Sequence, residues 1–155
     1  MFHLKEGDKA PNFKGLDQDE KTIELKDYKG KKVVLYFYPK DDTPGCTKEA
    51  CNFRDNHSKL QKMGFVVIGV SPDTTAKHNK FAHKYDLPFP LIADEDKKIL
   101  NDYGVWGLKK FMGKEYDGVH RTTFVIDEQG VIEKIITKVK TKESTEQILE
   151  ELSLS

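Results

Sequence analysis

The sequence predicts an α/β domain with a central mixed β-sheet flanked by helices. Residues 33–38 and 65–71 are continuous apolar runs rich in β-branched and aromatic side chains, typical of strands buried on both faces. The segment between them has the apolar period of a helix, so we expect parallel strands joined by a right-handed crossover. Residues 119–137 form two apolar stretches around a Glu-Gln-Gly turn, which predicts an antiparallel hairpin and makes the sheet mixed.

The composition indicates a single domain over residues 1–155, with 37% hydrophobic and 34% charged residues. The formal net charge is zero, which argues against general attraction to nucleic acid or to a membrane surface. The first residues lack the apolar core of a signal peptide, and no apolar run reaches membrane-spanning length. We therefore expect a cytoplasmic protein, in a compartment where disulfides are usually transient or catalytic.

The other elements follow in order along the chain. Residues 12–25 alternate apolar and polar side chains around a polar turn, which predicts an N-terminal hairpin, with an irregular surface loop as the alternative. The first helical pattern runs from residue 46 to about residue 63, where Gly64 ends it. A second helix follows residue 71, capped at Asp73 or Thr74.

The second half of the chain is predicted to contain a short strand at 91–93, a short helix ending at Gly104 and a C-terminal helix at 143–152. Residues 104–118 are rich in glycine and have no clean period, which predicts a long irregular loop. Its side chains Trp106, Phe111 and Met112 form either a lid beside a functional site or a plug at the end of the core.

Both cysteines lie in residues 36–51, the stretch that carries the candidate chemistry. Thr43 followed by Pro44 predicts a helix N-cap with proline at the first helical position, which places Cys46 third in the helix. Free backbone N–H groups and the positive end of the helix dipole favour a thiolate there. The Thr43 hydroxyl is expected to reach the Cys46 N–H, the sulfur or an oxygen bound beside it.

Cys51 follows five residues after Cys46. In one regular helix this spacing puts the Cα atoms roughly 8–9 Å apart, beyond the roughly 7 Å limit for a disulfide. Cys46 heads the apolar stripe of the helix, whereas Cys51 lies off it and is more peripheral. The spacing therefore predicts a disulfide that forms only when the first turns of the helix unwind.

Arg121 stands at the beginning of the strand in 119–127, which we expect to run antiparallel to the strand at 33–38. That beginning lies at the same sheet edge as the end of the first strand, and ligands collect at this edge. We therefore expect Arg121 close to Cys46, where a guanidinium stabilises a thiolate and donates hydrogen bonds to a substrate oxygen. A surface salt bridge is the alternative.

The histidines give little indication of a catalytic or metal-binding role. His57 lies on the buried stripe of the first helix but about three turns, roughly 16 Å, from Cys46, so we interpret it as a packing or surface residue. His78 and His83 are five residues apart, a poor spacing for a metal pair on a helix, and are expected to be exposed. Phosphate-binding glycine motifs are absent, so no cofactor and no metal are predicted.

Residues 39–46, Pro-Lys-Asp-Asp-Thr-Pro-Gly-Cys, resemble the PxxxTxxC active-site signature of the peroxiredoxins. Residues 46–55 and 106–116 are similar to segments of the bacterioferritin-comigratory-protein, or peroxiredoxin Q, branch, and residues 118–127 resemble the peroxiredoxin segment that carries the active-site arginine. The resemblance covers nearly the whole chain and implies a thioredoxin-like fold. It also implies a redox-active centre in which Cys46 is the peroxidatic cysteine and Cys51 the resolving one. Thr43 would hydrogen-bond the peroxide and Arg121 would stabilise the thiolate. Pro39 would shield the site from water, and Glu49 would support the arginine.

The resemblance implies a thiol-specific peroxidase that reduces hydrogen peroxide and organic hydroperoxides in antioxidant defence. Cys46 becomes a sulfenic acid and then a Cys46–Cys51 disulfide, which thioredoxin or glutaredoxin reduces. The branch is usually monomeric. Two alternatives of other classes are a thiol–disulfide oxidoreductase acting on proteins, which normally uses Cys-x-x-Cys, and a redox-switched binding module without turnover.

Overall fold

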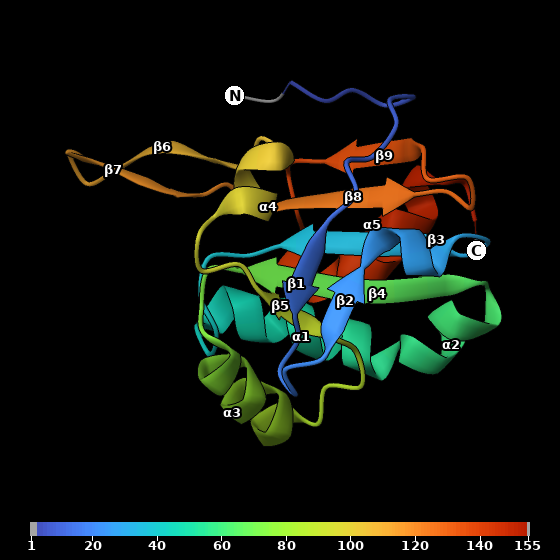
Figure 1. Ribbon diagram of the computed structural model, residues 1–155, viewed down its shortest axis with the longest axis horizontal. Helices are drawn as coiled ribbons and strands as arrows, with labels where there is room; N and C mark the ends of the chain where they lie inside the picture. Colours follow the sequence, from blue (N-terminus) through green and yellow to red (C-terminus); the bar gives the residue numbers. More distant parts are fainter. Residues whose placement is uncertain (1–2, 155) are drawn as a thin grey trace.

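A mixed β-sheet forms the centre of the fold. Residues 3–154, the part of the chain that the computed structural model describes, contain a seven-stranded sheet in the order β2-β1-β5-β4-β3-β8-β9 and a separate β6–β7 hairpin (Figure 1). The strands are β1 Lys14–Leu16, β2 Thr22–Glu24, β3 Lys32–Phe37, β4 Phe65–Ser71, β5 Leu91–Ala93, β6 Trp106–Phe111, β7 Lys114–Val119, β8 Thr122–Ile126 and β9 Ile132–Ile136.

The predicted topology is confirmed. Strands β3, β4 and β5 are parallel, while β8 runs antiparallel to β3 and pairs with β9 as a hairpin. The N-terminal hairpin β1–β2 is also present, rather than an irregular loop, and β1 joins the sheet beside β5. In Figure 1 the arrows of β3 and β8 point in opposite directions, so the end of β3 meets the beginning of β8.

Helices cover both faces of this sheet. They are α1 Pro44–Asp55, α2 His57–Lys62, α3 Thr75–Tyr85, α4 Lys98–Asp102 and α5 Ser144–Glu151, with 3-10 turns η1 Leu25–Tyr28 and η2 Thr141–Glu143. Alternate residues of β3 enter different cores because successive side chains of a strand point to opposite faces. Tyr36 packs with residues of α1, α2, α3 and α5, whereas Leu35 packs with residues of α4 on the other side.

The first helix departs from its predicted length. The pattern predicted one helix over 46–63, but the structure has two, because Asn56 leaves the helical conformation at φ −107° and ψ 10°. The Asn56 side-chain amide donates to the Asn52 carbonyl at 2.8 Å, an example of a short polar side chain competing with the helical ladder. Gly64 has a φ of +86° and ends the second piece as expected.

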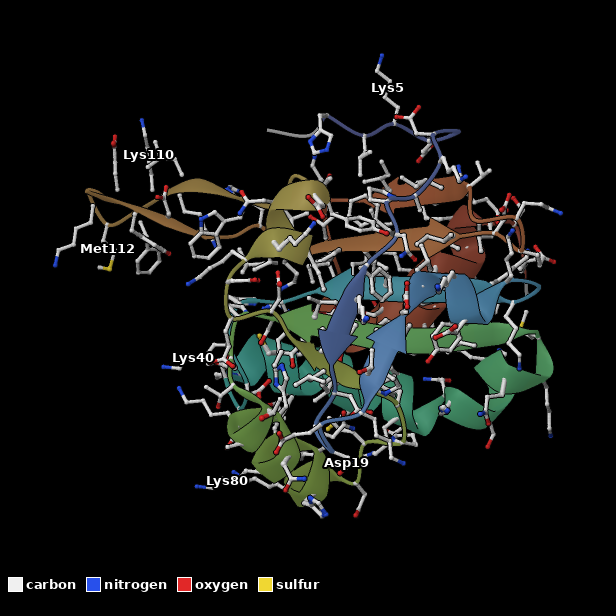
Figure 2. The ribbon with its side chains drawn as sticks, viewed as in Figure 1. Lys5, Asp19, Lys40, Lys80, Lys110 and Met112 are labelled. Carbon is white, nitrogen blue, oxygen red and sulfur yellow. The ribbon has the colours of Figure 1, made fainter. Side chains whose placement is uncertain are left out.

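The predicted irregular loop over 104–118 is wrong, because most of it forms the β6–β7 hairpin. Its turn residues Met112 and Gly113 have φ values of +51° and +78°, as a tight hairpin turn requires. Figure 2 shows Met112 at the far end of the hairpin, away from the sheet. Phe111 is 65% exposed and Met112 85% exposed, so neither forms a lid or a plug; Trp106 is half-buried against the core.

The histidine predictions are partly wrong. His78 is fully buried rather than exposed, because its ring nitrogens meet Asp41 and the Ile92 carbonyl. His83 is exposed as predicted. His57 stacks on Phe89 with ring centroids 6.2 Å apart, which confirms its interpretation as a packing residue. Within residues 3–154, no helix is both long enough and apolar enough to cross a membrane.

Candidate active site

The start of α1 places Cys46 as the sequence predicted. Thr43 is the N-cap, with extended φ and ψ of −98° and 158°, and Pro44 is the first helical residue. Cys46 is third in the helix, only 1% exposed, and belongs to the core that α1 shares with the sheet. Its sulfur therefore lies at the positive end of the helix dipole and in surroundings that exclude most water.

The Thr43 hydroxyl does not make the expected cap to the Cys46 N–H. It donates instead to the Lys40 carbonyl at 2.9 Å, which closes the turn between β3 and α1. The single hydroxyl proton is thereby used, so the Thr43 oxygen offers its lone pairs to any further partner. Pro39, also in this turn, is half-buried.

Arg121 reaches the site from the beginning of the neighbouring strand β8. Thr122, the first residue of β8, pairs with Phe37 at the end of β3, so Arg121 comes to the edge from which α1 begins. Its Nη2 donates to the Cys46 sulfur at 3.2 Å, and its Nη1 donates to Glu49 at 2.9 Å. The predicted proximity of Arg121 and Cys46 is confirmed, and the surface salt bridge is excluded because the Arg121 side chain is only 23% exposed.

Glu49 is the buried anchor of this arginine. Its side chain is fully buried one helical turn beyond Cys46, and burial raises its pKa to about 7 although the Arg121 charge and hydrogen bonds oppose the rise. Burial alone would lower the pKa of Arg121, but Glu49 and Cys46 together raise it above its ordinary value. The guanidinium therefore stays charged and is held in one orientation by two partners.

Gly45 has a role that the sequence did not reveal. A Cβ atom at this position would lie 3.3 Å from Nη2 of Arg121, tighter than most side chains tolerate, and 3.9 Å from a methyl group of Thr141. The absence of a side chain lets the guanidinium approach the start of α1 closely enough to reach the sulfur. The signal in the sequence is a glycine directly before the cysteine.

Cys51 has different surroundings in the same helix. Both cysteines are free, and Cys51 is half-buried in the middle of α1. Burial raises the pKa of the Cys51 thiol; Arg54 opposes this rise and Asp55 adds to it. Because α1 is continuous from residue 44 to residue 55, the helical spacing keeps the two cysteines too far apart for a bridge.

Asn52 fastens the middle of α1 to the C-terminal segment. Its amide nitrogen donates to the Lys142 carbonyl at 3.0 Å and to Glu146 at 2.9 Å, and its oxygen accepts from the Thr145 N–H at 2.8 Å. Ser144 of the same segment lies 3.4 Å from Glu49. None of these contacts was predicted, because the partners lie about ninety residues further along the chain.

The arrangement of these side chains supports nucleophilic chemistry at sulfur. The guanidinium and the free N–H groups of the helix start offer hydrogen-bond donors to the Cys46 sulfur and to an oxygen that reacts with it. Comparison with known proteins identifies the class. Residues 6–135 match the model of the AhpC/TSA family. The chain belongs to this family.

Individual relatives indicate the branch of the family to which the chain is similar. It is 49% identical over 146 residues to peroxiredoxin Bcp of Bacillus subtilis, covering 94% of this chain and 93% of that protein. Peroxiredoxin Bcp of Escherichia coli K12 is 47% identical over 149 residues, with 96% of each chain covered. The predicted resemblance to the Bcp and peroxiredoxin Q branch is confirmed, and with it the class of enzyme, a thiol peroxidase.

Solved structures agree with the fold. A PrxQ mutant of Xylella fastidiosa superposes with a TM-score of 0.92 at 29% identity, covering 99% of this chain and 98% of that one. The bacterioferritin comigratory protein of Xanthomonas campestris, a protein with alkyl peroxide reduction activity, matches with a TM-score of 0.85 at 30% identity, covering 91% and 90%. The predicted thioredoxin-like fold is therefore confirmed.

Proposed function

We propose that Cys46 is the peroxidatic nucleophile of this thiol peroxidase and that Arg121 activates it. The observation that carries the proposal is the 3.2 Å hydrogen bond from Arg121 to the Cys46 sulfur at the start of α1. Cys51 lacks such a donor, and burial raises the pKa of its thiol. Since the thiolate is the reactive form, the two cysteines are assigned different roles.

In the first step the Cys46 thiolate attacks the distal oxygen of a hydroperoxide. A sulfur–oxygen bond forms, the O–O bond breaks, and the leaving oxygen takes a proton to become water or an alcohol. Arg121 and the N–H groups of the helix start stabilise the negative charge on the oxygens. The Thr43 hydroxyl, which already donates to Lys40, accepts the peroxide proton as a hydrogen bond.

In the second step Cys51 attacks the sulfur of the Cys46 sulfenic acid, and water leaves as the disulfide forms. Both cysteines lie in one intact helix, so the first turns of α1 must unwind before this step. An external dithiol, thioredoxin or glutaredoxin, then supplies two electrons and two protons to restore both thiols.

Two further residues support the site. Glu49 fixes the direction of the Arg121 guanidinium through the 2.9 Å ion pair, and Pro39, half-buried in the preceding turn, shields the sulfur from bulk water. We propose hydrogen peroxide and organic hydroperoxides as substrates; the alkyl peroxide reduction of the Xanthomonas campestris relative supports the second class. A single domain over residues 1–155, a monomer and a cytoplasmic location stay predictions.

A coupled assay tests the proposal. The purified chain is mixed with NADPH, thioredoxin reductase and thioredoxin, and NADPH consumption is followed after addition of hydrogen peroxide or tert-butyl hydroperoxide. A parallel set uses NADPH, glutathione reductase, glutathione and glutaredoxin. We expect turnover with a dithiol protein and at least one peroxide. Reduction of insulin disulfides without peroxide turnover would instead identify a thiol–disulfide oxidoreductase, and peroxide-dependent oxidation without any turnover would identify a redox switch.

A further inference from the structure

A buried polar cluster lies beside the turn that leads into α1. His78 of α3 is fully buried, and its Nδ1 lies 2.6 Å from Asp41 in that turn. Asp41 also accepts a 2.6 Å hydrogen bond from the hydroxyl of Tyr38, while Nε2 of His78 lies 3.0 Å from the Ile92 carbonyl. The Asp41 side chain is only 6% exposed. The three side chains therefore form a largely buried network.

The protons of this network follow from the hydrogen-bond partners. A carbonyl oxygen only accepts, so Nε2 of His78 must carry a proton toward Ile92. Nδ1 then either donates as part of an imidazolium to the Asp41 carboxylate or accepts from a protonated Asp41 carboxyl. Both forms keep a hydrogen bond between the loop and α3, and the imidazolium–carboxylate form is charge-assisted, which makes it one of the stronger kinds.

The network fixes residues 39–43, which we name the entry loop. The Asp41 N–H donates to Asp73 at 2.7 Å, just before α3. Asp42, which has a left-handed φ of +57°, accepts from Lys84 at 2.8 Å and from the Tyr85 hydroxyl at 2.9 Å. The entry loop is thus docked on α3 at several points, of which the Asp41–His78 contact is buried and the Asp42 contacts are exposed.

We propose that His78 is a positioning residue of the peroxidase reaction, holding the entry loop closed through Asp41 while Cys46 meets peroxide. The inference rests on the proposed function, because the first turns of α1 must unwind before Cys51 attacks. Thr43 is both the last residue of the entry loop and the N-cap residue of α1, so unwinding of the first turn acts directly on the docked loop. His78 therefore governs the balance between the closed state, which reacts with peroxide, and the unwound state, which forms the disulfide.

The balance has a chemical readout. In the closed state a second peroxide oxidises the Cys46 sulfenic acid to a sulfinic acid, with water or an alcohol leaving. In the unwound state Cys51 forms the disulfide instead. The ratio of disulfide to sulfinic acid at a fixed excess of hydrogen peroxide therefore reports the balance, and peptide mass spectrometry measures both products.

The test compares His78→Phe with Asp41→Asn. Phenylalanine keeps the ring but removes both nitrogens, so we expect about tenfold slower oxidation of Cys46 and about a tenfold higher ratio of disulfide to sulfinic acid. In Asp41→Asn the new side-chain amide donates to Nδ1 of a neutral His78, and its oxygen still accepts from Tyr38. Asp41→Asn is therefore expected to stay within about threefold of the wild type. His57→Phe, at a packing histidine in α2, is the matched control.

The outcomes separate cleanly. If folded His78→Phe matches the wild type in both rate and ratio, or lowers the rate without moving the ratio, the positioning role is overturned. Should His78→Phe fail to fold, Asp41→Ala against Asp41→Asn decides: equal ratios overturn the proposal, and a raised ratio for Asp41→Ala alone supports it. A wild-type chain whose Cys46 does not react with peroxide contradicts the proposed function itself, whatever these variants do.

Discussion

The first turn of α1 and its middle offer a cysteine each, in opposite surroundings. At the first turn, Cys46 is buried, stands third in the helix and accepts a hydrogen bond from Arg121. In the middle, Cys51 is half-buried, and the nearest charges come from Arg54 and Asp55, which oppose one another in their effect on its pKa. One helix thus holds two sulfurs in different electrostatic surroundings.

Both residues are the same amino acid, so the difference in chemistry that we propose for them comes from their positions in the helix. The first turn supplies free N–H groups and a guanidinium, whereas the middle of the helix has its backbone groups already paired. The middle is also fastened by Asn52 to the C-terminal segment, while the first turn connects to the entry loop. Each of the following variants changes one side of this contrast.

Replacement of the cysteines themselves should have the largest effect. We expect Cys46→Ser to lower peroxide turnover at least about a thousandfold, because the nucleophile is lost. Cys51→Ser is expected to oxidise once at nearly the wild-type rate and then fail to turn over with thioredoxin. Stopped-flow peroxide consumption and the coupled assay measure the two steps. Full turnover by Cys46→Ser would show that the roles are assigned wrongly.

Removal of the guanidinium should come next. Arg121→Ala is expected to lower the rate constant for Cys46 oxidation by about 10²–10³, the usual cost of one preorganised donor to a developing charge. Arg121→Lys keeps the charge without the planar fork and should recover part of this loss. Arg54→Ala, beside Cys51, is the matched control and should leave the first oxidation unchanged. If Arg121→Ala and Arg54→Ala lowered the rate constant for Cys46 oxidation equally, the proposed difference between the two cysteines would be contradicted.

Glu49 should give the site a pH-dependent stability. Its pKa is raised to about 7 in the fold, above its ordinary value of 4.5, so the folded chain holds this proton more tightly than the unfolded chain does. Its stabilising contribution is complete below about pH 4.5 and is lost as pH rises through 7, amounting to about 3 kcal/mol.

Urea unfolding at pH 5 and pH 8 measures this contribution. We expect the free energy of unfolding of the wild type to fall more between these values than that of Glu49→Gln, whose side chain does not titrate. Glu150→Gln changes an exposed carboxylate on α5 and should keep the wild-type difference. If the free energy of unfolding of Glu49→Gln fell between pH 5 and pH 8 by as much as that of the wild type, the raised pKa of Glu49 would be disproved.

Asn52 should give the smallest effect. Asn52→Ala removes three hydrogen bonds between α1 and the C-terminal segment, so we expect a loss of about 1–2 kcal/mol in stability and a few-fold faster disulfide formation. Thermal unfolding and quenched-flow mass spectrometry measure these changes. Asn101→Ala in α4, whose side-chain amide donates to the carbonyl of Lys97 at the start of the same helix, is the control. Unchanged disulfide formation would mean that Asn52 does not restrain the unwinding.

Local signals made much of the site predictable. The Thr-Pro pair identified the start of α1, because N-cap and first-position preferences depend only on neighbouring residues. Arg121 needed one further step, since the antiparallel direction of β8 follows from the hairpin that it forms with β9. Both inferences used rules that act within one element or between adjacent elements.

The features that sequence reasoning missed depend on distant partners. His78 is buried because Asp41, 37 residues earlier, faces it, and nothing near His78 indicates this pairing. Asn52 finds its partners about ninety residues along the chain. The β6–β7 hairpin was missed for a local reason: its turn is Met112-Gly113, without the Asn-Gly or Asp-Gly pair that marks most such turns.

The interruption at Asn56 has a consequence for cooperativity. Helix melting spreads along a continuous hydrogen-bonded ladder, because neighbouring residues share the cost of nucleation. The backbone conformation changes at Asn56, which separates α1 from α2, and Leu60 anchors α2 in the core. Melting that begins at Cys46 can include Cys51 and stop at this boundary. In the proposed second step, the two sulfurs then meet while the core contacts of α2 stay in place.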